Sequence, residues 1–476
     1  MKKILIIALV ILSGELFAQS NLGFFHMGGA LPQGANYNPA YFPDARVYVS
    51  LPGISGIDLS VNNSFGISDI LTETGDSTLI DINKFLGTQQ KDKSFFNMNL
   101  AITDLMIGFR IGEKSYMSLF VNERIDATMF YPIDLMNFVW RGNAAYVGQN
   151  FVADKMGYSM THYREWGIGY GRSFDILGRE TTIGARFKYL NGMLHSSTED
   201  FAISILTDDD YSLTATFNDA QIRQAGITQL EEDDFDASYF IFNGNGGFGF
   251  DLGARMQFTE KLGLGASIND LGFINWKENA EVISFTNTTF EYSGINLDNT
   301  DSFGEAITDS LDNIKSKTTE TTFSTTLNGR TYFTADYLLA SNGYAQATLA
   351  NYFSQGRLKT SVGLGITQPV GKWFMASATT SYVPQQGVDL GLGLMFRLSS
   401  FQLYVAADNL FNSLNVPEAS AANIKVGLNL LFGRSQKKSV KKVTPTPAVE
   451  AKDATSSTEI EDDYSHLWDS GKKKKK

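Results

Sequence analysis

The sequence predicts an all-β fold, a transmembrane antiparallel β-barrel of about 14 strands with an N-terminal hatch-like segment and long outer loops. Three observations predict this fold. The chain begins with a pattern typical of export, no later apolar run is long enough for a membrane helix, and apolar residues alternate with polar ones along many segments.

The start of the chain has the pattern of a cleavable signal peptide. An apolar run over residues 4–12 follows Lys2-Lys3, and small and apolar residues lead up to Ala18-Gln19. The run is too short to cross a bilayer as a helix. We therefore expect a signal peptide over residues 1–18, cleavage after Ala18 and an exported mature protein.

The composition excludes several classes of protein. The chain has no cysteine, so it forms neither a disulfide framework nor a thiolate metal site. It has 35 Phe, 20 Tyr and 44 Gly, and its mean hydropathy is −0.13. A value near zero suits a membrane barrel, because lipid-facing and lumen-facing residues alternate and dilute the mean. A secreted soluble β-sandwich remains open on composition alone.

Alternation in the C-terminal half favours the barrel. Val388, Leu390, Leu392, Leu394 and Phe396 alternate with Asp389, Gly391, Gly393 and Arg397. This period of two puts the apolar set on one face of a strand long enough to cross a hydrocarbon layer, whereas sandwich strands have a mode of about 5–6 residues. The opposite face would line a lumen. Its predicted lining is Arg186, Lys188, Gly247, Gly249, Asp251, Gly253, Arg255, Asp389 and Arg397.

The predicted barrel covers residues 46–433. Its strands are expected near 55–66, 96–110, 115–127, 163–174, 181–194, 247–258, 262–270, 324–337, 343–354, 358–368, 372–383, 387–397, 400–408 and 421–432. The total of about fourteen is even, as in single-chain bacterial barrels. Every second connection is short, whereas the long ones, 67–95, 128–162, 195–246 and 271–323, all fall on the other side. Short periplasmic turns and long outer loops are typical of such barrels.

The last predicted strand carries an assembly motif. Its residues Lys425, Gly427, Leu430 and Phe432 resemble the β-signal by which outer-membrane barrels are recognised for assembly. A terminal aromatic ring suits the interface between lipid and water. We therefore expect the barrel assembly machinery and outer-membrane lipid as partners.

Charge is concentrated in two loops and the tail. The formal net charge is −12, and loops 195–246 and 271–323 hold much of the acidic excess. Runs such as Asp208-Asp209-Asp210 and 231–234 leave a Ca²⁺ site open, but no spaced ligand loop of known type is present, so we favour a solvated surface and expect no metal or cofactor. The basic tail 434–476 lacks apolar periodicity, and we expect it to be disordered in the periplasm.

The segment ahead of the first strand, 19–45, is a poor strand. It is rich in glycine and proline, and proline cannot donate to a ladder. A free linker would gain nothing from the rings of Tyr37, Tyr41 and Phe42. We therefore expect a hatch inside the barrel, in which Asn38 hydrogen-bonds its own turn and Pro39 fixes the direction of the chain.

The same segment carries a family resemblance. Asn38-Pro39-Ala40-Tyr41 resembles the Asn-Pro-Ala box in the hatch of the long-chain fatty-acid transporter superfamily, whose likeness extends to accessory barrels of the type IX secretion system. More closely, residues 36–71 and the closing Asp408-Asn409-Leu410 resemble an outer-membrane family of Bacteroidota. The resemblance implies a barrel in the outer membrane and no established activity.

Catalysis has little support in the residues. The chain has only four histidines, His26, His162, His195 and His466, too few for a multi-histidine metal site. His195-Ser196-Ser197 is similar to the His-x-Ser spacing of the outer-membrane phospholipase, which would make Ser197 a nucleophile, His195 its base and Asn191 the orienting group. That enzyme is a smaller barrel, and we expect no enzyme here.

Two functions of different class remain open. One, which the superfamily resemblance favours, is a channel or transporter for a hydrophobic or small solute, with residues 19–45 as its plug. The other is a scaffold whose outer loops and tail bind protein partners in secretion or envelope organisation. No nucleic-acid partner is expected.

Overall fold

The computed structural model describes residues 27–433 except 66, 75–76, 89–93, 219, 228–238, 240, 286–287, 293–315, 355, 372, 384–386 and 410–420. The predicted signal peptide, its cleavage after Ala18, residues 19–26 of the predicted hatch, the acidic run 231–234 and the tail 434–476 lie outside the described residues.

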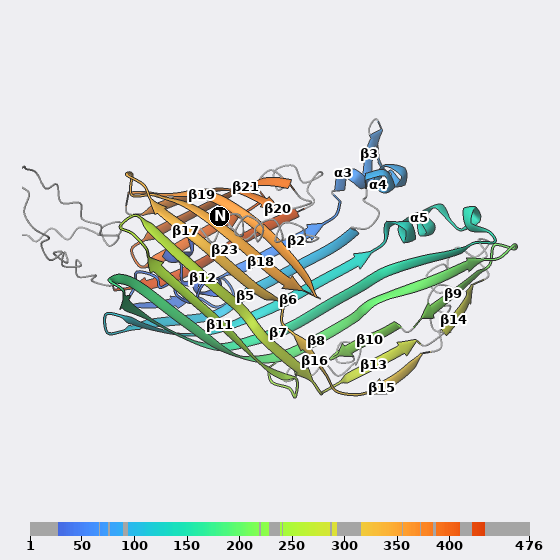
Figure 1. Cartoon of the computed structure of the whole chain (residues 1–476), viewed down its shortest axis with the longest axis horizontal. Coiled ribbons are helices and arrows are strands. Elements are labelled where there is room, and N and C mark those ends of the chain that lie inside the picture. The colour runs from blue at the N-terminus through green and yellow to red at the C-terminus, as the bar shows by residue number, and fades with distance from the viewer. Residues whose placement is uncertain are drawn as a thin grey trace, which may run out of the picture.

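Fourteen antiparallel strands close into a barrel, as predicted (Figure 1). The first is split into β1 (Val47–Ser50) and β2 (Ile57–Asn63), and both parts pair with β5 (Ser94–Ile111) on one side and with the last strand, β23 (Ala421–Phe432), on the other. The remaining strands are β6 (Ser115–Tyr131), β7 (Asn150–Ile176), β8 (Arg179–Thr207), β11 (Gly246–Gln257), β12 (Leu262–Trp276), β17 (Gly329–Leu338), β18 (Tyr344–Ser354), β19 (Arg357–Val370), β20 (Phe374–Val383), β21 (Gly387–Leu398) and β22 (Phe401–Ala407).

At one rim of the barrel every connection is short, whereas the other rim carries the long connections together with two short ones, β18–β19 and β20–β21. The β7–β8 hairpin turns on Leu177 and Gly178, whose φ angles are 56° and 72°. Two consecutive positive φ angles are the type I′ geometry that matches the twist of a two-residue hairpin. The short rim is therefore built from tight turns, which leaves the outer rim to carry the larger structures.

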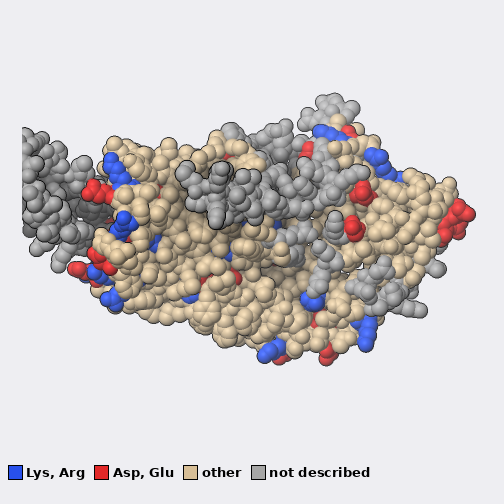
Figure 2. All heavy atoms as spheres, in the orientation of Figure 1, with Lys and Arg blue, Asp and Glu red and all other residues tan. Residues whose placement is uncertain are grey.

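The two faces of the wall differ in polarity. Outward side chains form an apolar belt, and on the face drawn in Figure 2 the charged residues gather toward the two ends of the molecule. A long apolar belt of this kind matches the hydrocarbon core of a bilayer. Among the described residues, no helix is long and apolar enough to cross a membrane. The belt includes Leu119, Ile168, Phe187, Leu264, Leu364, Leu392 and Leu403.

The outer rim differs from the prediction, because much of the predicted loops is sheet. β7 and β8 continue well past the barrel, and shorter strands pair along their ends to form an outer extension (Figure 1). Its short strands are β9 (Leu213–Asn218), β10 (Ala220–Ala225), β13 (Ala280–Phe285), β14 (Thr288–Tyr292), β15 (Lys317–Glu320) and β16 (Phe323–Thr326). Each is too short to cross a membrane, so the pattern of wall strands did not reveal them, except for β16, which overlaps the strand predicted at 324–337.

Small helices stand on the opposite side of the outer rim. They are α3 (Ile67–Ile70), α4 (Ile82–Thr88) and α5 (Ile133–Arg141), with a hairpin of β3 (Leu71–Thr74) and β4 (Ser77–Ile80). Phe85 and Leu86 of α4 pack against Ile133 of α5 and against Phe65. Apolar contact thus joins segments from two separate outer connections.

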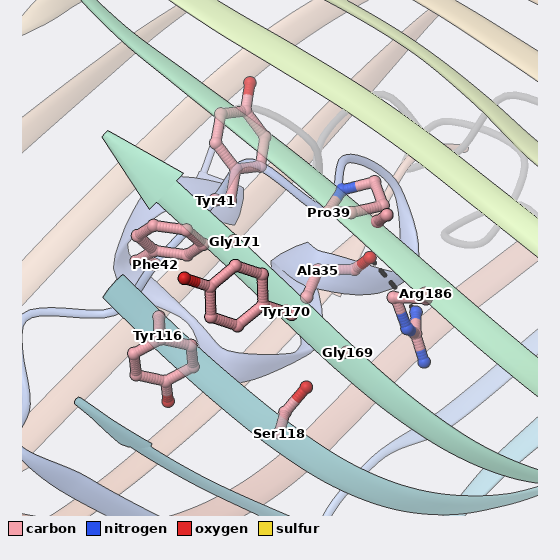
Figure 3. A pocket seen from close by; sticks show the side chains of 11 residues that line it. Ala35, Pro39, Tyr41, Phe42, Tyr116, Ser118, Gly169, Tyr170, Gly171 and Arg186 are labelled. Carbon is pink, nitrogen blue, oxygen red and sulfur yellow. Dashed lines mark hydrogen bonds between the residues drawn. The ribbon is translucent and has the colours of Figure 1, made fainter. Parts of the chain in front are cut away.

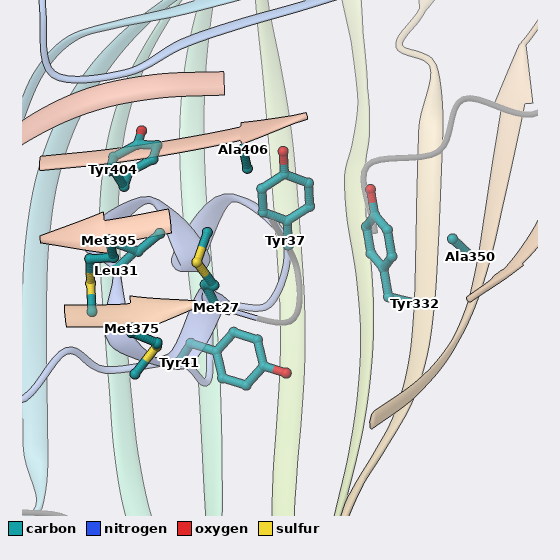
Figure 4. Packing of buried hydrophobic residues seen from close by; sticks show 10 residues of the cluster. All are labelled: Met27, Leu31, Tyr37, Tyr41, Tyr332, Ala350, Met375, Met395, Tyr404 and Ala406. Atoms are coloured by element: carbon teal, nitrogen blue, oxygen red, sulfur yellow. The ribbon is translucent and has the colours of Figure 1, made fainter. Parts of the chain in front are cut away.

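Residues 27–45 lie inside the barrel, toward the rim of short turns. They form two 3₁₀ turns, η1 (Gly28–Ala30) and η2 (Pro32–Asn36). Met27, Leu31 and Tyr37 pack on inward side chains of the wall, including Met395 and Tyr404 (Figure 4). We call residues 27–45 the hatch.

Candidate functional site

The hatch turns sharply at Asn38 in the middle of the lumen. The Asn38 side-chain oxygen accepts a hydrogen bond from the Ala40 N–H at 2.9 Å, which is the predicted turn. Inward glycines of the wall make room for it. A Cβ at Gly184 would collide with the Pro39 carbonyl, and one at Gly253 would collide with the Asn38 side chain. Glycine at these two positions therefore allows the turn to seat directly against the wall.

Tyr37 is the most extensively anchored residue of the turn. Its carbonyl accepts hydrogen bonds from Ser267 at 2.6 Å and Asn269 at 2.8 Å. Its hydroxyl donates to Asp58 at 2.8 Å and contacts Lys425, which is itself 3.2 Å from Asp58. Burial, with the Asp58 carboxylate as a second cause, raises the pKa of the Tyr37 hydroxyl well above its usual value. The hydroxyl therefore keeps its proton and serves as a donor.

Gln33 ties the hatch to both strands at the closing seam. Its side-chain amide donates to the Ser55 carbonyl at 2.5 Å and to Asn429 at 2.7 Å, and Asn429 donates back at 3.1 Å. Ser55 belongs to the segment that splits the first strand. The hatch thus spans the junction between the first and last strands of the barrel.

A buried charge network fills the lumen next to the hatch. Lys188 contacts three carboxylates, at 2.9 Å for Asp251, 3.4 Å for Glu165 and closer still for Asp270. Asp270 also binds Arg330, and Arg124 lies 3.6 Å from it. Buried charges are stable only when they are paired in this way. The network therefore acts as a cross-strand brace as well as a barrier in the lumen.

Asp270 enters the network through a β-bulge. The register of β11 and β12 shifts between Phe250 and Leu252, and Asp270 has a φ of 61°. Its N–H donates to Asp251 at 2.8 Å. A left-handed conformation is unusual for a residue other than glycine and persists only when the surroundings hold it. The bulge is thus the device that turns a second carboxylate into the lumen.

The network is joined to the hatch by Arg186. Its guanidinium donates to the Ala35 carbonyl at 3.0 Å and to the Asn36 side chain at 2.7 Å, and it lies 3.6 Å from Asp251. Beside it, between the hatch and β6–β8, lies a cavity of ≈ 10 Å³ (Figure 3). The hatch and the network together leave room there for little more than one water molecule.

Most of the chain matches one protein family. Residues 39–408 match the family model described as "Family of unknown function (DUF5723)". The chain belongs to this family. A comparison with curated proteins finds no match.

Several solved structures are similar to this DUF5723 barrel. The Pseudomonas putida toluene transporter TodX has 10% identity and a TM-score of 0.41, covering 84% of this chain and 94% of that one. A Pseudomonas aeruginosa FadL homologue has 9% identity and a TM-score of 0.38, covering 88% and 100%. The translocator domain of the autotransporter NalP from Neisseria meningitidis has 11% identity and a TM-score of 0.30, covering 88% and 99%.

The predicted lumen residues of this DUF5723 chain separate into two groups. Arg186, Lys188 and Asp251 meet in the network, as described above. Arg255 lies apart from them, 2.9 Å from Asp336, and Asp389 accepts a hydrogen bond from Asn409 at 2.9 Å. Arg397 is in β21 close to the short-turn rim, and Gly247, Gly249 and Gly253 face inward on β11.

Sequence reasoning missed several residues that hold the hatch and the network. Asp58 follows the inward alternation of its strand and could have been found by the same rule as Asp251. Asp270 breaks the alternation because of its bulge, so a period of two does not select it. The full set missed is Gln33, Asp58, Arg124, Glu165, Asp270, Arg330 and Asn429.

The four predicted assembly residues of β23 face opposite ways. Phe432 is 45% exposed on the outer surface, and Leu430 shares that face. Lys425 and Gly427 point inward, and a Cβ at Gly427 would collide with Ser55. The inward pair therefore serves the hatch and the seam in the folded barrel. The role of the four residues in assembly stays a prediction.

The histidine–serine spacing gives a pair and not the triad of the phospholipase-like alternative. His195 lies in the outer extension, with Nε2 2.9 Å from the Ser197 hydroxyl and Nδ1 3.0 Å from the Thr161 hydroxyl. Asn191 instead contacts Ile241 and Asn243. A bulge between β7 and β8 near residue 162 shifts the register, so Asn191 and His195 face opposite sides of the sheet. Nearly complete burial lowers the pKa of His195 to about 4.

The acidic run at residues 208–210 forms a hairpin tip. Asp210 accepts hydrogen bonds from the Ser212 N–H at 3.0 Å and from its hydroxyl at 2.6 Å, and the Tyr211 N–H donates to the Asp208 carbonyl. These contacts close the β8–β9 turn. In the part of the chain that the structure describes, no group of three or more His, Asp or Glu residues is arranged to hold a metal ion.

Proposed function

We propose that this DUF5723 protein is an outer-membrane channel for a small polar solute, gated by the hatch. The observation that carries the proposal is the seat of the hatch. The hatch is held in the lumen by hydrogen bonds through Gln33, Tyr37 and Arg186, beside the apolar packing of Met27 and Leu31. When the hatch moves, hydrogen bonds to water can replace these hydrogen bonds to the wall.

The lining of the lumen supports a polar solute over a hydrocarbon. The inner face of β17 to β21 is rich in small hydroxyl side chains. The buried hydroxyl oxygens of Ser361 and Ser381 have no hydrogen-bond partner among the described residues. Such groups fit a wall that meets water or hydroxylated and amide-bearing solutes. The set comprises Thr334, Thr348, Ser361, Thr367, Ser377, Thr379 and Ser381.

The apolar belt supports residence in a bilayer, and export followed by insertion would place the barrel in the outer membrane. Cleavage after Ala18, a periplasmic tail and the absence of enzymatic activity belong to the same proposal. Bacteroidota as the source and kinship with type IX secretion barrels stay predictions from sequence.

Removal of the hatch tests the channel. Deleting residues 21–43 while keeping the signal peptide should give a folded barrel with severalfold higher single-channel conductance in planar bilayers. A deletion of residues 440–470, in the tail, is the matched control and should leave conductance unchanged. A folded hatch deletion that conducts no better than the full chain would rule out gating by this segment.

A second function has its own support. The network and the hatch close the lumen tightly, and the outer extension presents a large sheet beyond the membrane. A scaffold that binds protein partners needs both features and no pore. For a scaffold, the hatch deletion would still conduct in bilayers, but solute uptake by cells that carry it would be unchanged. Deletion of the outer strands would abolish binding of the protein partner.

A further inference from the structure

One edge of the Arg186 guanidinium makes no hydrogen bond to the described residues. Its Nη1 atom makes both hydrogen bonds to the hatch, and the ring of Phe120 lies 3.6 Å below the guanidinium carbon. The Nε and Nη2 atoms are buried and have no hydrogen-bond partner among the described residues. These two atoms form one edge of the guanidinium, with two parallel N–H donors.

This free edge lies beside the cavity between hatch and wall. Arg186 is the only charged residue among the described residues that line the cavity, and Ser118 contributes a hydroxyl (Figure 3). A Cβ at Gly169 would lie 3.2 Å from the Arg186 side chain and would collide with the Ser118 hydroxyl. The glycine therefore keeps open the space between the Arg186 side-chain stem and the Ser118 hydroxyl. With a volume of ≈ 10 Å³, the cavity has room for one molecule or ion of about the size of water.

The local charge favours an anion in that space. The contacts of the ion-paired network join four cations to three carboxylates. Arg186 sits at its end, 3.6 Å from Asp251, whose other oxygen already binds Lys188. Asp126 is the remaining carboxylate nearby, and it acts on Arg124 and Arg330 at the other end. With Asp126 included, the four cations face four carboxyl groups, and Arg186 is the one cation of this group that lines the cavity. The members are Arg124, Arg186, Lys188, Arg330, Glu165, Asp251 and Asp270.

We propose that the seam between hatch and wall is a binding site for a single monoatomic anion of chloride size, held by the Nε and Nη2 atoms of Arg186 with the Ser118 hydroxyl beside it. The bound anion pairs with Arg186 and fills the cavity between the hatch and the wall. It thereby locks the closed state. This inference concerns the resting protein and holds whether the barrel conducts solutes or serves as a scaffold.

Bromide is the probe that tests the site, because its anomalous scattering separates it from water. Crystals of the mature protein grown in sodium bromide should show an anomalous peak at hydrogen-bonding distance from Arg186 Nε. An ordinary water peak there without anomalous signal would overturn the proposal. The peak should disappear in Gly169→Ala, in which the new methyl group occupies the space. It should persist in Gly249→Ala, whose Cβ would make ordinary contacts of 3.5 Å and 3.6 Å elsewhere in the lumen.

Solution measurements cover variants that do not crystallise. Replacing gluconate by ~0.3 M chloride should raise the apparent unfolding temperature of the wild type by ~2–4 °C, as expected for a ligand that binds only the folded state. The shift should be absent in Arg186→Gln and Gly169→Ala and present in Gly249→Ala. A shift of equal size in all four proteins would mean a general salt effect and would contradict the site.

Discussion

Lys425, on the strand that closes the barrel, donates a hydrogen bond to the hydroxyl of Tyr37 in the hatch. The same ammonium group lies 3.2 Å from Asp58 on the first strand. One buried cation thus links the hatch to both strands of the closing seam. The sequence predicts an assembly role for Lys425, and the two roles can be separated by experiment.

Lys425→Met should loosen the hatch without preventing insertion. It leaves the Asp58 carboxylate and the Tyr37 hydroxyl without their cation, at a cost of about 1–3 kcal/mol to hatch docking. The heat-modifiable gel shift of the folded barrel should persist while single-channel recordings show more frequent openings. Tyr37→Phe, which removes only the hydroxyl, should give a weaker form of the same effect. Loss of folded barrel in Lys425→Met would assign the residue to assembly instead.

Phe432→Asp should impair assembly. Phe432 is 45% exposed on the outer face of the last strand, so the substitution puts a carboxylate next to lipid headgroups and removes the terminal ring of the predicted assembly signal. The amount of heat-modifiable barrel in the outer-membrane fraction should fall. Leu431→Ala changes the neighbouring inward residue and should alter stability more than yield. Normal yields for Phe432→Asp would remove the support for the signal.

Asp270→Asn should destabilise the barrel strongly. It takes the shared carboxylate from Lys188 and Arg330 and leaves two buried cations poorly paired, which typically costs about 3–5 kcal/mol. The temperature at which heat modifiability is lost should drop. Asp336→Asn is the matched control, because Asp336 has a single, part-exposed cation partner, Arg255, and its replacement should cost less than that of Asp270. Equal effects of both changes would show that the network is no brace.

Acidification should loosen the outer extension at His195. Its pKa is lowered to about 4 in the folded chain, against a usual value of about 6.5, because burial disfavours the charged ring. A lowered histidine pKa gives stability that is fully present above pH ~6.5 and is lost as the pH falls toward ~4. The ring of Trp276 lies 5.2 Å from the imidazole, so its fluorescence should report the transition.

The matched variant for this transition is His195→Gln, which keeps a hydrogen-bonding side chain and cannot acquire the charge. Its Trp276 fluorescence should be flat over the same pH range. A transition of the same size in the variant would have to come from other groups, and the assignment to His195 would then be wrong.

Sequence alone was sufficient for the wall and for the presence of the hatch. Period-two alternation identifies a wall strand because one side meets lipid and the other a polar lumen, so the pattern alone assigns Leu392 and Asp389 to opposite faces. A turn at Asn38 was predictable for a local reason, the hydrogen bond from its own side chain to the backbone two residues on.

What the sequence did not predict depends on register and long-range pairing. Asp270 enters the lumen only because of a bulge opposite Asp251. A bulge between β7 and β8 likewise places Asn191 and His195 on opposite faces of the sheet. The strands of the outer extension are short and are stabilised by partners far away in the chain, such as β10 with β13. Local patterns carry no information on such pairings.

A reversible tether between hatch and wall tests the central claim, that movement of the hatch opens the barrel. The chain has no cysteine, so Asn38→Cys/Gly253→Cys places one thiol pair where a Cβ at Gly253 would touch the Asn38 side chain. Oxidised, this protein should stay as closed as the wild type; reduced, it should open in the same bilayer, since both substitutions disturb the seat of the turn. The single variants should not respond to reductant. Equal conductance of the oxidised and reduced double variant would contradict a hatch-gated channel.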